Sequence, residues 1–162
     1  MAELWDAYGA GLTPIAGRTL TRGEQIPEGV FHLVSDVIVR HADGSWLLMQ
    51  RAPEKKFGLM WEATAGGSAL CGETPLECAR RELYEETGIR TNELIEVGRV
   101  ETAPGRTIYV EFKCVTEADK NSVRLQKGET VAYRWVTTEE LKAMKKAELV
   151  TERMQRFISE LR

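Results

Sequence analysis

The stretch GGSALCGETPLECARRELYEETGI, residues 66–89, organises the fold of this chain around one helix. It opens with two glycines, continues into a helix-start signal, and holds five glutamates in 24 residues. Thr74 can cap a helix, Pro75 fits its first turn, and Glu77 completes a T-x-x-E capping box. Gly88 is a good helix stop. The pattern therefore predicts a helix between Thr74 and Gly88.

The predicted helix separates apolar from acidic residues. At about 100° of rotation per residue, the side expected to face the core carries Leu76, Ala79, Leu83 and Thr87. An adjacent face carries Glu82, Glu85 and Glu86, where each like-charge pair costs roughly a few tenths of a kcal/mol. Arg81 lies four residues before Glu85, so an ion pair between them can orient that carboxylate. A solvated acidic face with this salt bridge is one interpretation, and a divalent cation held by the carboxylates is the other.

Two glycines precede the helix and favour the second interpretation. The sequence Ala65-Gly66-Gly67 lets the backbone adopt unusual dihedral angles and approach a ligand closely. The carbonyl oxygen of Gly66 can then add an oxygen ligand to the same cation. A simple turn is the alternative for a Gly-Gly pair taken alone. Together, the glycines and the acidic helix indicate a site for a hard cation such as Mg²⁺, Mn²⁺ or Ca²⁺.

The spacing of these residues resembles a known signature. Five residues separate Gly67 from Glu73, and seven more separate Glu73 from Arg81-Glu82-Leu83. One residue then precedes Glu85-Glu86, and one more precedes Gly88-Ile89. This spacing resembles the Nudix box, G-x5-E-x7-R-E-U-x-E-E-x-G-U, at every defined position. Ala65 stands where many members of the family carry proline, which leaves the substrate subgroup open.

The resemblance to the Nudix family implies a fold, a metal site and an activity. It implies an α/β/α sandwich and hydrolysis of a nucleoside diphosphate linked to another moiety, with Mg²⁺ (or Mn²⁺) in a loop–helix–loop site. Glu82 and Glu86 are then the chief metal ligands, with Glu85 a ligand or its close support. Arg81 orients the carboxylates. Nudix hydrolases are often dimers, so a homodimer is the expected assembly.

Hydrolysis of a diphosphate also needs a proton acceptor and further cations. A carboxylate must take the proton of the attacking water. Glu82, Glu85 and Glu129 are the candidates, and an ordinary loop glutamate is the alternative for Glu129. Arg51 ends a predicted strand and offers bidentate geometry to phosphate. Lys55, in the loop that follows, is the second candidate for phosphate binding, with a simply solvated lysine as the alternative.

The rest of the chain alternates strand and turn signals. Expected strands lie at 3–9, near 18–21, and at 30–40, 46–51, 62–67, 97–101, 108–116 and 131–136. TTEELKAMKK and VTERMQRFISELR indicate two later helices, the first opened by a capping box of Thr137 and Glu140. Because strands and helices are mixed, we expect an α/β (α+β) fold with a mixed sheet flanked by helices. One domain is expected over residues 1–162, with 1–29 as an N-terminal strand extension.

Composition narrows the class of protein. A net charge of −3 gives no global attraction to nucleic acid or to an anionic membrane. No apolar run approaches the roughly 20 residues of a membrane span. Three cysteines without metal-type spacing indicate free thiols in a reducing compartment, so a cytoplasmic protein is expected. Cys78 is expected in packing and His32 in the core. The expected partner is a small-molecule nucleoside diphosphate derivative.

Two other functions stay open at this level. His32, Arg51 and Lys55 also match the pattern of the isopentenyl-diphosphate isomerases, which use the same fold. Gly66 and Ser68, however, occupy the places where that chemistry needs a cysteine and a histidine. A catalytically silent nucleotide-binding module is the other alternative, although the box here is intact. The candidate substrates are ADP-ribose, a nucleotide sugar, a dinucleoside polyphosphate and an oxidised nucleoside triphosphate.

Overall fold

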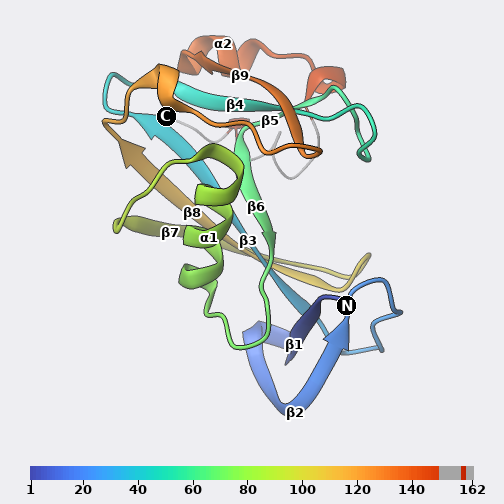
Figure 1. The fold of residues 1–162 in the computed structure, drawn as a ribbon. Coiled ribbons are helices and arrows are strands. Elements are labelled where there is room, and N and C mark those ends of the chain that lie inside the picture. The colour runs from blue at the N-terminus through green and yellow to red at the C-terminus, as the bar shows by residue number, and fades with distance from the viewer. Residues whose placement is uncertain (150–157, 160–162) are drawn as a thin grey trace.

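The structure, a computed structural model, describes residues 1–149 and 158–159 (Figure 1). The strands of this part of the chain are β1 (Leu4–Gly9), β2 (Thr13–Thr21), β3 (His32–His41), β4 (Trp46–Arg51), β5 (Trp61–Glu62), β6 (Thr64–Ser68), β7 (Leu94–Thr102), β8 (Thr107–Thr116) and β9 (Thr130–Val136). The helices are α1 (Pro75–Thr87) and α2 (Thr138–Ala143), with short 3₁₀ segments at Ala10–Leu12, Lys120–Ser122 and Lys146–Glu148. Each strand expected from the sequence is present.

The strands form one mixed sheet and one small hairpin. The main sheet has the order β5-β4-β3-β8-β7, with β6 paired to β3 and β9 paired to β4. Its centre is parallel, since β3 and β8 run side by side from His32↔Thr107 to His41↔Thr116 without a register shift. The pairs around that centre are antiparallel. This arrangement confirms the expected α+β fold with a mixed sheet.

Alternation along the central strands separates two cores. Successive side chains of a strand point to opposite faces of a sheet. On β3, Val37 and Val39 pack in the cluster that holds Leu83 of α1, whereas Ile38 packs in the cluster that holds Leu141 of α2. Figure 1 shows α1 in front of β3 and beside β6, with α2 above β9. The sheet is therefore covered by a helix on each face, as the expected α/β/α sandwich requires.

Local signals place α1 where the sequence predicts it. Thr74 accepts a hydrogen bond from the Glu77 amide, and the Glu77 side chain accepts one from the Thr74 amide, which completes the capping box. Gly88 ends the helix with φ +75°, a conformation that suits glycine, and its amide donates to the Tyr84 carbonyl at 2.8 Å. The predicted core face is confirmed: Ala79, Leu83 and Thr87 are buried, and Leu76 packs against the same core while half-buried.

The N-terminal residues form an antiparallel hairpin of β1 and β2. Tyr8 exchanges backbone hydrogen bonds with Phe31 at 2.8 and 2.9 Å, which attaches the hairpin to the start of β3. β2 begins at Thr13, earlier than the short strand predicted near 18–21. Pro14 and Gly17 are residues typical of turns, but a hairpin edge tolerates both because no second neighbour needs their backbone groups.

The C-terminal part adds a short helix to the second core. Thr137 and Glu140 form the predicted capping box at the start of α2. The helix predicted over 150–162 lies outside the described residues except for Ile158 and Ser159, and Ile158 is buried beside Leu141. Within the described part of the chain, no helix has the length and apolar character to span a membrane.

Candidate active site

The two glycines of β6 allow two close approaches, of β3 to Gly66 and of α1 to Gly67. A Cβ atom on Gly67 would lie 2.5 Å from Oε1 of Glu82, and one on Gly66 would overlap the Asp36 side chain and lie 2.5 Å from the Ser35 carbonyl oxygen. The hydroxyl of Ser35 donates to the Pro75 carbonyl at 2.8 Å and so ties the first turn of α1 to β3. Glycine is needed here for close approach rather than for a turn.

Arg81 connects the glutamates of the predicted box. Its Nε and Nη2 donate to the two oxygens of Glu73 at 2.7 and 2.9 Å. Its Nη1 donates to Glu82 at 2.6 Å and to Glu85 at 3.2 Å, so the predicted pair between Arg81 and Glu85 is confirmed. Nη2 also donates to the Ser68 carbonyl at 3.1 Å. The guanidinium lowers the pKa of Glu73, and in return Glu73 and Glu82 raise the pKa of Arg81. Arg81 therefore fixes these carboxylates relative to the end of β6.

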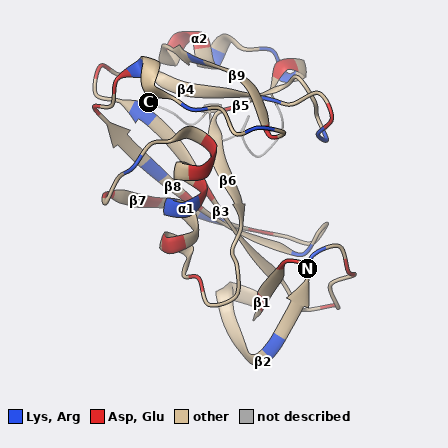
Figure 2. Ribbon diagram, in the orientation of Figure 1, with Lys and Arg blue, Asp and Glu red and all other residues tan. Residues whose placement is uncertain are grey.

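Glu86 is a half-buried carboxylate at the centre of the group. Its Oε2 accepts a hydrogen bond from the Gly66 amide at 3.1 Å. Burial raises the pKa of Glu86 well above its ordinary value, and the charges of Glu62 and Glu82 raise it further. Burial also raises the pKa of Glu82 against the opposing effect of Arg81. Figure 2 shows acidic residues of α1 beside β6. Without a compensating cation, this site disfavours ionisation of its own carboxylates.

Two acidic residues of the site were missed by the sequence analysis. Asp36 is buried on β3, directly opposite Gly66 in the strand register. Glu62 lies on β5, and its pKa is raised by burial and by the charge of Asp36. The negative charges of both raise the pKa of Glu86. One signal was available: Asp36 interrupts the apolar run VFHLVSDVIVR, where an acidic residue has no place in a simple core strand.

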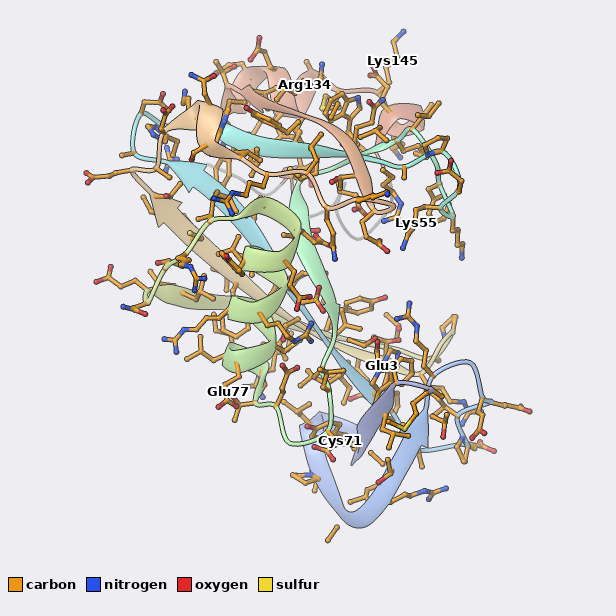
Figure 3. The ribbon with its side chains drawn as sticks, viewed as in Figure 1. Glu3, Lys55, Cys71, Glu77, Arg134 and Lys145 are labelled. Carbon is orange, nitrogen blue, oxygen red and sulfur yellow. The ribbon has the colours of Figure 1, made fainter. Side chains whose placement is uncertain are left out.

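The predicted phosphate-binding residues lie next to this acidic cluster, defined here as Asp36, Glu62, Glu82 and Glu86. Arg51 donates from Nη1 to Glu62 at 2.5 Å and from Nε to the Lys56 carbonyl at 2.8 Å. Lys55 forms an ion pair with Glu129, and its charge lowers the pKa of Glu62. Figure 3 shows Lys55 in the loop between β4 and β5. The fold thus brings Arg51, Lys55 and Glu129 to one side of the cluster, although each already has a protein partner.

The donor set of the cluster fits a hard divalent cation. Carboxylate oxygens, with a backbone carbonyl nearby at Gly66, are the ligands such cations prefer. Burial, and after it the charges of neighbouring carboxylates, raise the pKa values of Glu62, Glu82 and Glu86, and a cation would offset both effects. In this conformation Glu82 and Glu85 turn toward Arg81. Within residues 1–149 and 158–159, no three Asp, Glu, His or Cys side chains already stand as a metal-binding set. Metal binding would therefore require side-chain rotation.

The neighbouring thiols and the histidine behave as expected from the sequence. Cys78 is fully buried, and its Sγ contacts the Gly67 carbonyl at 3.4 Å, which confirms a packing role. Cys71, Cys78 and Cys114 are all free thiols. His32 is buried against Trp5, with ring centroids 4.4 Å apart, and burial lowers its pKa to about 4.

Comparisons with known proteins agree with this geometry. A model of the NUDIX domain family matches residues 30–161 of the chain. An uncharacterized Nudix hydrolase of Listeria monocytogenes is 31% identical over 148 residues, covering 88% of this chain and 85% of the relative. The crystal structure of DR0079 from Deinococcus radiodurans gives a TM-score of 0.75 at 19% identity, covering 97% of this chain and 98% of that chain. The NUDIX domain of Shewanella oneidensis NrtR, solved in complex with ADP ribose, gives a TM-score of 0.64 at 17% identity, covering 80% of this chain and 84% of that chain.

Proposed function

Because the chain belongs to the Nudix family and is a hydrolase, we propose that it cleaves the diphosphate linkage of a nucleoside diphosphate derivative at a divalent-cation site. The observation that carries the proposal is the placement of Glu86. Its carboxylate accepts a hydrogen bond from the Gly66 amide, is half-buried, and lies near the charges of Glu62, Glu82 and Asp36. A carboxylate in such surroundings either keeps its proton or is compensated by a cation, and a bound divalent ion would supply that cation.

Each group at the site then has a distinct role. Glu82 and Glu86 would hold the cation, with the Gly66 carbonyl and Glu85 as further oxygen donors. When bound, Mg²⁺ or Mn²⁺ neutralises charge on the diphosphate, positions the attacking water and lowers its pKa. Arg81, fixed by Glu73, keeps the carboxylates of α1 oriented. Arg51 and Lys55 are proposed to bind the phosphates from the side of Glu62, since cations placed there offset the charge of the substrate.

Several carboxylates are candidates for the acceptor of the water proton. Burial raises the pKa of Glu62 and of Glu82, which makes each a stronger base once it is ionised. Glu85 is more open, with 43% of its side chain exposed, and Glu129 is paired with Lys55. The base is the residue whose Glu→Gln variant loses rate while the cation still raises the melting temperature. A ligand residue would lose both.

The proposed substrate class comes from the box and from one structural neighbour. The Nudix domain of the Shewanella oneidensis protein was solved with ADP ribose, a nucleoside diphosphate linked to a second sugar. A suitable panel contains ADP-ribose, a nucleotide sugar, a dinucleoside polyphosphate, an oxidised nucleoside triphosphate and isopentenyl diphosphate. Release of phosphate or of a nucleoside monophosphate is measured with Mg²⁺, with Mn²⁺, and with a chelator.

The expected result is turnover of at least one nucleoside diphosphate derivative that requires the added cation. Tight binding of one compound without any turnover would instead identify a silent binding module. Conversion of isopentenyl to dimethylallyl diphosphate would identify an isomerase. Light scattering on the same preparations tests the expected homodimer.

A further inference from the structure

A pocket lies between the loop that follows β2 and the turn that joins β7 to β8. Its volume is about 380 Å³, which falls in the range of roughly 300–1,000 Å³ that small-molecule sites occupy. Side chains from four separate segments line it: Trp5, Glu24, Gln25, Ile26, His32 and Arg106. Figure 1 shows the N-terminal hairpin near one end of the long strand β3, with β4, β9 and α2 near the other.

The inner wall of this pocket is aromatic and uncharged. The rings of Trp5 and His32 stack at 4.4 Å with an angle of 19° between their planes. Nε2 of His32 lies 2.8 Å from the Thr107 hydroxyl. Burial lowers the pKa of His32 to about 4, so its ring is uncharged near neutral pH. Ile26 packs against the Trp5 cluster and adds an apolar surface to the same wall.

The rim of the pocket is polar and carries both donors and acceptors. Glu24 and Gln25 are exposed at its entrance, and Arg106 is half-buried on the opposite side. The Arg106 carbonyl accepts from the His32 amide at 3.0 Å, which fixes the turn against β3. An uncharged wall of aromatic and apolar side chains with a mixed polar rim matches a heteroaromatic ring, whose faces are apolar and whose edge carries donors and acceptors. The carboxylate of Glu24 disfavours a phosphate group at this entrance.

Strand β3 connects this pocket to the acidic cluster. His32 and Asp36 point to the same face because they lie an even number of residues apart on a regular strand. At a rise of about 3.3 Å per residue they are about 13 Å apart along the strand, and Val34 between them is only half-buried. Ser68 also lies between the pocket and the acidic cluster. Its hydroxyl is 3.5 Å from Nδ1 of His32, and its carbonyl accepts a hydrogen bond from Arg81.

We propose that this pocket binds the nucleobase of the substrate while the diphosphate lies about 13 Å away at the acidic cluster. This inference rests on the proposed function for the position of the diphosphate. The pocket then selects the base through Glu24, Gln25 and Arg106, whereas the residues of the Nudix box act only on the diphosphate. The N-terminal hairpin is thereby a specificity element, because Trp5 and the loop after β2 build most of the pocket.

The test is isothermal titration calorimetry of the protein with adenosine, guanosine, cytidine and uridine, each in the presence of a chelator. Nucleosides carry no phosphate, so the metal site contributes nothing to their binding. The variants are Glu24→Ala, which removes a rim acceptor, and Gln25→Trp, which fills the entrance from an exposed position. The matched control is Glu28→Ala, an exposed glutamate of the same loop that does not line the pocket.

We expect at least one nucleoside to bind saturably, and both pocket variants to weaken that binding at least about tenfold while the control leaves it unchanged. Absence of saturable binding by all four up to about 10 mM, or binding that both pocket variants leave unchanged, overturns the proposal. The titration needs no turnover. An inactive protein that binds a nucleoside in this way would refute the hydrolase and keep the pocket, whereas an active protein that fails the titration would refute the pocket alone.

Discussion

Replacement of Glu86 by glutamine tests the acidic cluster most directly. The Gln side chain keeps the shape of Glu86 and an oxygen that can accept the Gly66 amide bond. It removes the charge that burial, Glu62 and Glu82 disfavour. We therefore expect two opposite effects: the metal-free protein becomes more stable, and the metal-dependent activity is lost. A residue with a purely structural role would lose stability and activity together.

The size of each effect follows from the site. Loss of a metal ligand is expected to reduce kcat at least about 100-fold, or about 2.7 kcal/mol of barrier. For stability, a gain of about 1 kcal/mol raises Tm by roughly 2–4 °C in a chain of this size. We expect Glu86→Gln to melt at least about 2 °C above the wild type at pH 8 with a chelator. The control is Glu93→Gln, an exposed glutamate outside the site.

The pH dependence of stability tests independently whether ionisation of Glu86 destabilises the metal-free protein. The pKa of Glu86 is raised in the folded protein, so the folded state keeps this proton to higher pH than the unfolded chain does. The metal-free wild type should lose stability as pH rises from the ordinary glutamate value of 4.5 through the raised pKa. Below 4.5 this contribution is fully present. Thermal melts between pH 4 and 9 should show a smaller decline for Glu86→Gln. An unimpaired or destabilised Glu86→Gln protein would refute the reasoning.

Three further predictions test the glycine contact, the helix cap and the thiols. Gly67→Ala places a methyl group against Glu82, and we expect at least about a tenfold loss of kcat/KM, whereas Gly9→Ala, where a Cβ has room, keeps full activity. Thr74→Ala removes the N-cap and should lower the free energy of unfolding by about 1 kcal/mol in urea titrations. A thiol reagent should modify one cysteine of the native protein, the exposed Cys71, and all three cysteines after denaturation; fast labelling of a second native thiol would contradict the packing described here.

The helix of the site could be read from the sequence because its signals are local. The capping residues Thr74 and Glu77 act on backbone groups within one turn, and Gly88 acts on the last turn. The ion pair between Arg81 and Glu85 also depends only on helical spacing. Such contacts form whatever the rest of the fold does, so residue order alone predicts them.

The sequence by itself therefore determined the helix, its acidic face, the mixed sheet and the resemblance to the Nudix box. Only the tertiary structure decided that Asp36 and Glu62 join Glu86, since β3, β5 and α1 are far apart in the chain and meet through strand register. The same holds for Arg51, whose position at the end of a predicted strand suggested a phosphate ligand and whose guanidinium pairs with Glu62 in the structure. The physical reason is that sheet pairing and burial fix which distant charges share one low-dielectric site, and no local spacing encodes that.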